Sequence, residues 1–189
     1  MRLDPAYRPI SVDEFFAIDF GSDRRFELVD GVIQMMTGGS AFHAATAGNI
    51  YFALRQKLRG TGCRPFNSDM GLRVDEVNLR YPDVAVYCGK ELLFADEDAL
   101  AFDDPVVIFE VVSPSTSALD QGTKFGEYRR LASLQAIVFV DPANRLTRVH
   151  TRQADEADSW LDRGWAAPHD VHLPSLGITL TEAEIFARD

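Results

Sequence analysis

The sequence predicts an α/β (α+β) fold in which helices flank one mixed central β-sheet, and three apolar segments carry that prediction. The segments are residues 80–87, 106–112 and 136–142. Each is rich in valine, isoleucine or phenylalanine over consecutive positions, which is typical of a strand buried on both faces. One predicted helix, at 42–58, precedes these strands and another, at 122–131, separates the second from the third. We therefore expect a sheet covered by helices.

The first half of the chain shows clear local signals. Ser11-Val-Asp-Glu14 is a capping-box pattern that starts a short helix. Residues 25–36 read as a hairpin, because apolar residues surround the turn pair Asp30-Gly31. The helix at 42–58 has an apolar stripe that His43 extends by one turn at its start. A histidine in that position is either a hydrogen-bonded core residue or a functional one, and both readings stay open.

The remaining elements are predicted from weaker patterns. Residues 63–74 form one or two strands, and the acidic stretch 89–104 is a solvated loop. The helix at 122–131 follows Asp120, whose charge suits a helix N-terminus. Residues 145–151 alternate as an edge strand. The chain then continues through a hairpin to a final helix at 180–186.

Length and composition predict one soluble domain over residues 1–189. No apolar run reaches the length of a membrane span and the N-terminus lacks a signal-peptide core, so we expect the cytoplasm. The net charge of −10 argues against indiscriminate nucleic-acid binding but leaves a local basic groove open. Cys63 and Cys88 lack the close spacing of a disulfide framework or a zinc site and are interpreted as small buried thiols.

Glu110 is the first candidate functional residue, because it interrupts the apolar strand at 106–112. A carboxylate there costs several kcal/mol unless it is paired, protonated or bound to a cation. The alternative is a glutamate at the end of the strand, tied to a backbone amide or to an arginine.

Asp83 is the second candidate, at the start of the strand at 80–87. If the two strands are neighbours, Asp83 and Glu110 converge and can hold a hard cation such as Mg²⁺ or Mn²⁺. Such a cation lowers the pKa of bound water and stabilises charge on a phosphoryl oxygen. Lys124, or less readily Lys90, would supply the accompanying positive charge.

Four ordered motifs resemble the Uma-two family of restriction-endonuclease-like proteins, in the PD-(D/E)XK nuclease superfamily. They are Tyr81-Pro-Asp-Val-Ala-Val86, Phe109-Glu-Val-Val-Ser-Pro-Ser-Thr116, Asp120-x-x-x-Lys124-x-x-x-Tyr128 and Val138-x-Val-Asp-Pro142. The resemblance also covers Phe26-Glu-Leu-Val-Asp-Gly31 and His43, and it spans roughly residues 10 to 150.

The resemblance implies a restriction-endonuclease-like core with Asp83 and Glu110 as metal ligands. It implies that Lys124 replaces the missing lysine of the Glu-x-Lys motif, because this chain has Val112 at that position. Glu27 matches an additional acid of the site. We also expect His43 and Tyr128 to contact the substrate or to support the metal ligands.

These observations predict a Mg²⁺-dependent endonuclease that cleaves DNA and acts as a homodimer if it cuts both strands. Two alternatives remain from the sequence. One is a binding module that keeps the nuclease fold without turnover, which Val112 and the acidic net charge favour. The other is a metal-dependent hydrolase of small phosphate esters.

Overall fold

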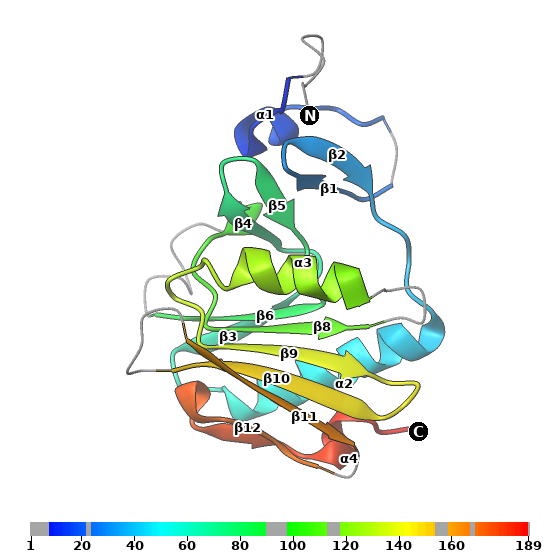
Figure 1. The fold of residues 1–189 in the computed structure, drawn as a ribbon, viewed down its shortest axis with the longest axis vertical. Helices are drawn as coiled ribbons and strands as arrows, with labels where there is room; N and C mark the ends of the chain where they lie inside the picture. Colours follow the sequence, from blue (N-terminus) through cyan, green and yellow to red (C-terminus); the bar gives the residue numbers. More distant parts are fainter. Residues whose placement is uncertain are drawn as a thin grey trace.

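The fold is built on a six-stranded mixed sheet, which a computed structural model shows for residues 8–21, 24–89, 98–112, 118–153, 159–166 and 169–188 (Figure 1). The strand order is β11-β10-β9-β8-β6-β3, and only the β8–β9 pair is parallel. The strands are β3 (Cys63–Asn67), β6 (Val84–Cys88), β8 (Val107–Val111), β9 (Ala136–Asp141), β10 (Leu146–Arg152) and β11 (Trp160–Ala166). The predicted mixed sheet is confirmed.

Two helices cover opposite faces of this sheet. Helix α2 (Ala41–Lys57) packs on one face together with β12 (Val171–Leu173), β13 (Ile178–Leu180) and α4 (Glu182–Ile185). Helix α3 (Ala118–Tyr128) packs on the other face. Among the described residues, none of the helices is long and apolar enough to span a membrane.

Strand β8 is buried along its whole length, and its residues alternate between the two faces. Val107, Phe109 and Val111 join the core beneath α2, while Ile108 joins the core beneath α3. Glu110 has the same parity as Ile108, so the strand directs its carboxylate towards α3. This alternation decides which helix can reach the buried acid.

A second sheet holds the N-terminal hairpin beside the first one (Figure 1). Its order is β2-β1-β5-β4-β7, with β1 (Phe26–Val29), β2 (Val32–Met35), β4 (Gly71–Asp75), β5 (Asn78–Arg80) and β7 (Ala101–Phe102). Helix α1 (Val12–Phe16) packs on it through Phe15, Leu28 and Leu79. The capping box at Ser11 and the hairpin turn at Asp30-Gly31 are both confirmed, and both turn residues have positive φ.

Three element predictions need correction. Residues 80–87 are not one strand: β5 ends at Arg80 and β6 begins at Val84, around Pro82, which has no N–H to donate. Strand β10 is not an edge, because it pairs with both β9 and β11. Helix α3 begins at Ala118, four residues earlier than predicted. Lys90 and half of the predicted acidic loop, residues 90–97, lie outside the described residues.

The interpretation of Cys63 and Cys88 as free thiols is wrong, because they form a disulfide. The two residues are direct partners in the antiparallel β3–β6 pair, and their Cα atoms are 4.0 Å apart. Sequence spacing gave no signal, since 25 residues separate them and only the strand register brings them together. Disulfides are characteristic of oxidising compartments, so the cytoplasmic location stays a prediction.

We expect Cys88→Ser to lower the free energy of unfolding by about 3 kcal/mol, because the cross-link closes a 25-residue loop and restricts the unfolded chain. Urea unfolding of the oxidised wild type and the variant measures this difference. The double variant with Cys63→Ser should match the single variant. Equal stability of oxidised wild type and variant would contradict the prediction.

Candidate active site

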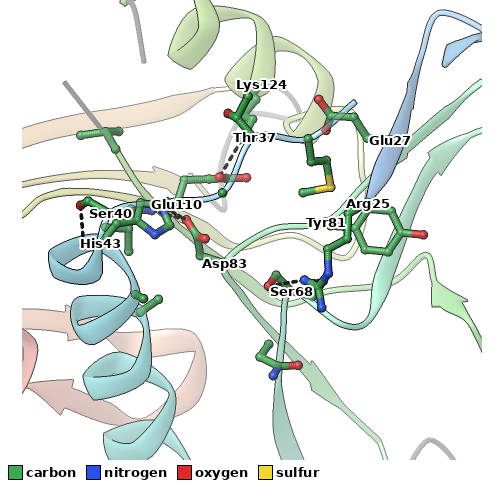
Figure 2. Close-up of a pocket in the computed structure, with 18 of the residues that line it drawn as sticks. Arg25, Glu27, Thr37, Ser40, His43, Ser68, Tyr81, Asp83, Glu110 and Lys124 are labelled. Atoms are coloured by element: carbon green, nitrogen blue, oxygen red, sulfur yellow. Dashed lines mark hydrogen bonds and ion pairs between the residues drawn. The ribbon is translucent and has the colours of Figure 1, made fainter. Parts of the chain in front are cut away.

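A cavity of about 1010 Å³ opens at the ends of β6 and β8, and most of the predicted site residues line it. Figure 2 shows His43, Asp83 and Glu110 close together with Lys124 above them, whereas Glu27 lies apart on β1. The predicted residues that line the cavity are Glu27, His43, Asp83, Glu110 and Lys124. Tyr128, the sixth predicted residue, is fully buried and contacts Glu110.

Asp83 and Glu110 are brought together by strand register. Strands β6 and β8 are antiparallel neighbours with Val84 opposite Phe109, so the next step of the register places Asp83 opposite Glu110. Asp83 Oδ2 also accepts a hydrogen bond of 2.7 Å from the backbone N–H of Val111. The two strands are thus neighbours, as expected, and they run antiparallel.

The Glu110 carboxylate is 5% exposed and has two partners on α3. Lys124 Nζ donates to Oε2 at 2.8 Å, and the Tyr128 hydroxyl donates to Oε1 at 2.7 Å. Lys124 and Tyr128 are four residues apart, so they lie on one face of the helix. The alternative partners, a backbone amide or an arginine, find no support among the contacts of the described residues.

Burial raises the pKa of Glu110, because the charged form loses its hydration. Lys124 opposes this by favouring the carboxylate, while the charge of nearby Asp83 raises the pKa of Glu110 further. Burial and the adjacent Glu110 also raise the pKa of Tyr128 well above its usual value. Tyr128 therefore stays protonated and remains a hydrogen-bond donor.

His43 lies in the first turn of α2 and faces Asp83. Ser40 caps this helix by accepting a hydrogen bond of 3.2 Å from the backbone N–H of His43. The imidazole Nε2 is 3.4 Å from Asp83 Oδ2, and the hydrogen bond to Asp83 raises the pKa of His43 despite partial burial. Gly39 packs against the ring, since a Cβ there would lie 2.6 Å from Nδ1.

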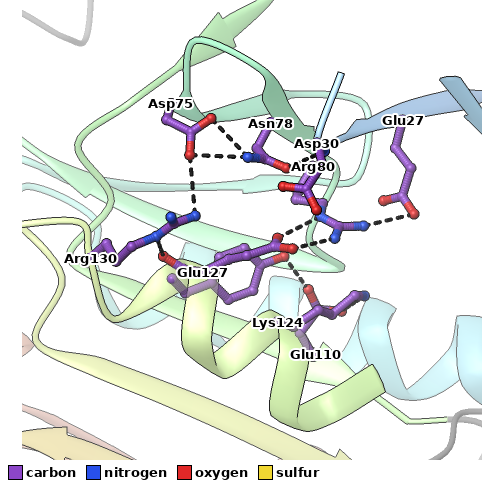
Figure 3. Close-up of polar contacts among 10 residues, drawn as sticks. Glu27, Asp30, Asp75, Asn78, Arg80, Glu110, Lys124, Glu127 and Arg130 are labelled. Atoms are coloured by element: carbon purple, nitrogen blue, oxygen red, sulfur yellow. Dashed lines mark hydrogen bonds and ion pairs between the residues drawn. The ribbon is translucent and has the colours of Figure 1, made fainter. Parts of the chain in front are cut away.

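Glu27 occupies the cavity wall, but its carboxylate is engaged by a buried cation (Figure 3). Arg80 Nη1 lies 3.0 Å from Glu27 Oε1. The same guanidinium donates two hydrogen bonds, of 2.8 and 2.7 Å, to Glu127 on α3. Arg80 is 4% exposed and ties β1, β5 and α3 together.

Sequence reasoning missed Arg80. Burial alone would lower its pKa, but the hydrogen bonds to Glu127 and the charge of Glu27 raise it. The available signal was a cation immediately before Tyr81-Pro82-Asp83, next to the apolar Leu79 at the end of a short strand.

Asp83 and Glu110 suit a hard divalent cation. Within the described part of the chain, no group of three or more histidine, cysteine or acidic side chains has the geometry of a metal site. Mg²⁺, however, is commonly held by one or two carboxylates, with waters and substrate phosphates as the other ligands. Burial is the main cause of the raised pKa of Glu110, and the charge of Asp83 adds to it. A cation between the two carboxylates would relieve their mutual repulsion.

A second part of the cavity wall was also not predicted. Arg25 Nη1 donates to the carbonyl and hydroxyl oxygens of Ser68, both at 3.2 Å, and Arg25 Nη2 forms an ion pair with Asp69. Tyr81 lines the same side. Tyr81 opens the motif that contains Asp83, but neither Arg25 nor Ser68 carries a sequence signal of its own.

Comparisons with known proteins identify the family and a similar fold. The family Uma2, described as "Putative restriction endonuclease", matches residues 12–181. Two uncharacterized Synechocystis proteins are similar: slr1290 is 27% identical over 94% of this chain and 91% of its own length, and sll1609 is 30% identical over 70% and 75%. A crystal structure from Anabaena variabilis, titled as a putative nuclease belonging to DUF820, has a TM-score of 0.76 at 18% identity and covers 95% of this chain and 98% of its own.

We expect Glu110→Gln to be more stable than the wild type at neutral pH. A raised carboxyl pKa means that folding favours the protonated group, so its contribution to stability is complete below pH 4.5 and is lost as the pH rises. The advantage of the variant should therefore shrink as the pH approaches 4.5. Urea unfolding across this pH range measures it.

Glu14→Gln is the control, because the pH dependence of its effect on stability should have the opposite sign. Its hydrogen bond with Arg8 lowers the pKa of Glu14 to about 2, so that carboxylate stabilises the fold above pH 4.5 and the contribution is lost as the pH falls towards 2. A Glu110→Gln variant that is less stable than the wild type at neutral pH would contradict the expected sign.

Arg80→Gln should lower the free energy of unfolding by about 3 to 5 kcal/mol, because it leaves Glu27 and Glu127 without their buried cation. Arg130→Gln is the matched control, since its ion pair with Asp75 joins side chains that are 56% and 36% exposed. That pair is expected to contribute about 0 to 1 kcal/mol. Equal losses in the two variants, measured by urea unfolding, would overturn the assignment of Arg80 as a buried link.

Proposed function

Because the chain belongs to the Uma2 family, we propose that it is a Mg²⁺-dependent endonuclease that hydrolyses phosphodiester bonds in DNA through a PD-(D/E)XK-like site. One observation carries the proposal: Glu110 faces Asp83 at the cavity while Lys124 contacts its carboxylate. Two acids and a lysine at one point of a cavity are the groups that phosphodiester hydrolysis needs.

Asp83 and Glu110 would hold the cation. When bound, Mg²⁺ or Mn²⁺ supplies Lewis-acid stabilisation of the charge that develops on the phosphoryl oxygens. Each acid is also oriented by the protein: Val111 and His43 contact Asp83, and Tyr128 contacts Glu110. These contacts support the proposed roles of His43 and Tyr128, which are to orient the two metal-binding carboxylates.

Lys124 would offset negative charge at the reacting phosphate and orient the attacking water. The strand position that carries this lysine in the superfamily is Val112, which lines the same cavity. The 2.8 Å contact of Lys124 with Glu110 supports the displacement of this function from β8 to α3. A positive charge delivered from the helix can serve the same phosphate, because it reaches the same carboxylate.

Glu27 would support the site through Arg80 and not as a metal ligand. Its ion pair of 3.0 Å with Arg80 offsets its charge and couples the N-terminal hairpin to α3. This arrangement favours a positioning role for Glu27.

Cleavage of plasmid and single-stranded DNA in Mg²⁺ and in Mn²⁺ tests the proposal. We expect Asp83→Asn, Glu110→Gln and Lys124→Met each to reduce the rate by about 100- to 1000-fold, the scale of losing one electrostatic contribution to the transition state. Lys57→Met is the matched control, because its partner Glu184 lies outside the cavity. It should retain the wild-type rate.

No cleavage by the wild type with either cation would favour the binding-module alternative. Turnover of small phosphate esters without cleavage of DNA would favour the third hypothesis. Cleavage that persists unchanged in Asp83→Asn would place the reaction elsewhere in the protein.

A further inference from the structure

A second, smaller cavity adjoins the candidate active site on the side of the N-terminal helix. It has a volume of about 320 Å³, at the lower end of the range for small-molecule sites. We call it the aromatic pocket, because its lining includes Phe15 and Phe16 of α1, Phe20 after α1 and Phe26 of β1, together with Arg24. Arg25, Ser68 and Tyr81 belong to the walls of both cavities. The two cavities therefore meet at these three residues.

The aromatic rings of this pocket are already arranged as a stack. Phe20 and Phe26 are nearly parallel, with centroids 4.3 Å apart and an interplanar angle of 17°. Phe15 approaches Phe20 at 5.3 Å with a tilted ring. Phe20 and Phe26 are only half-buried, so the stack is not closed off from the pocket that it lines. Another flat aromatic group can be added to such a stack.

The charges around the pocket suit an anionic strand and not a purely apolar ligand. Arg24 is exposed, and it donates to Met35 Sδ at 3.8 Å. Arg25 is held by Ser68 and by its ion pair with Asp69, which offsets the one carboxylate among the described residues that line the pocket. Within this described lining, two arginines against one aspartate leave a positive balance. Proteins that bind single strands combine cations for the backbone with aromatic rings for the bases.

We propose that the aromatic pocket binds one unpaired nucleobase of the substrate strand, next to the phosphate held at the active site. This inference rests on the proposed nuclease function and makes it more specific: the substrate is a single strand, or a duplex opened locally. Arg25 and Tyr81 form the boundary between the base and the reacting phosphate, while Arg24 contacts the neighbouring backbone. The base stacks against the Phe20–Phe26 pair. Recognition by stacking tolerates any base, since every base has an aromatic face.

Abasic substitution tests the pocket directly. Single-stranded oligodeoxynucleotides with one abasic site, moved stepwise past the cleavage position, are cleaved in Mg²⁺ and kcat/KM is measured. Stacking of one base contributes about 1 to 3 kcal/mol, which corresponds to about a five- to 150-fold loss. We expect this loss at one position only, adjacent to the cut.

Phe20→Leu identifies the pocket as the cause, because it removes the ring and keeps an apolar side chain of similar bulk. It should reduce kcat/KM on the intact strand, and the abasic site should then cause little further loss. Phe52→Leu is the matched control: Phe52 is 62% exposed on α2 and lines neither cavity. It should retain the full abasic effect. Thermal unfolding of both variants identifies any loss that comes from misfolding.

A second variant does not depend on the aromatic core. Arg24→Gln should raise KM for the strand and weaken its salt dependence, because one phosphate contact is lost. Arg59→Gln, at an exposed position after α2, should change neither.

The possible failures are distinguishable. If the wild type cleaves normally and tolerates abasic sites at every position, the aromatic pocket holds no base and only this inference is overturned. The same conclusion follows if Phe20→Leu retains the full abasic effect. If the wild type cleaves neither single-stranded nor plasmid DNA, the proposed function fails and this inference fails with it.

Discussion

The structure depends on keeping one carboxylate, that of Glu110, inside the central sheet. Glu110 is only 5% exposed, so its charge loses most of its hydration, and repulsion from Asp83 adds to the cost of the charged form. The protein compensates with Lys124 and Tyr128, which reach the two carboxylate oxygens separately. Both come from one face of α3. The position of this helix on the sheet is therefore fixed by the charge as well as by apolar packing.

Arg80 extends this constraint to the rest of the molecule. It holds Glu127, one residue before Tyr128, so the helix that supports Glu110 is attached to the second sheet. Its contact with Glu27 attaches the N-terminal hairpin to the same point. Buried ion pairs add little net stability compared with apolar residues, but they penalise wrong arrangements strongly because an unpaired partner is costly. We infer that this network mainly specifies where α3 and the hairpin lie.

The parts of the fold that were predicted correctly are those with strong local signals. Strand β8, helix α2 and the Asp30-Gly31 turn each carry their evidence in consecutive residues. The errors concern properties set by distant partners. Whether β10 is an edge depends on β11, whose Trp160–Ala166 sequence has no clear alternation. The disulfide of Cys63 and Cys88 depends on the register of two strands, which spacing along the chain does not reveal.

The residues of the candidate site also fall into those with a local sequence signal and those whose role depends on distant partners. Asp83 and Glu110 were found because charges in or beside an apolar strand are conspicuous, whereas Lys124 was inferred from the need for a nearby cation and from the family resemblance. The structure gathers all three at one cavity. Arg80 and Arg25 were missed because arginine is a common residue that usually lies on the surface. Only their surroundings in the fold make these two unusual. The role of Glu27 could not be predicted either, because it depends on the ion pair of Glu27 with Arg80. A site residue that acts through another residue leaves little trace in its own local sequence.

The acidic character of the chain limits how such a site can bind nucleic acid. With a net charge of −10, long-range attraction of a phosphate backbone is weak, so affinity must arise from contacts inside the cavities. A divalent cation between Asp83 and Glu110 would convert the most negative point of the site into one that attracts phosphate. Stacking in the aromatic pocket would add affinity that involves no net charge and changes little with salt. An acidic nuclease of this design would bind poorly to intact duplex and would favour strands whose bases are already exposed.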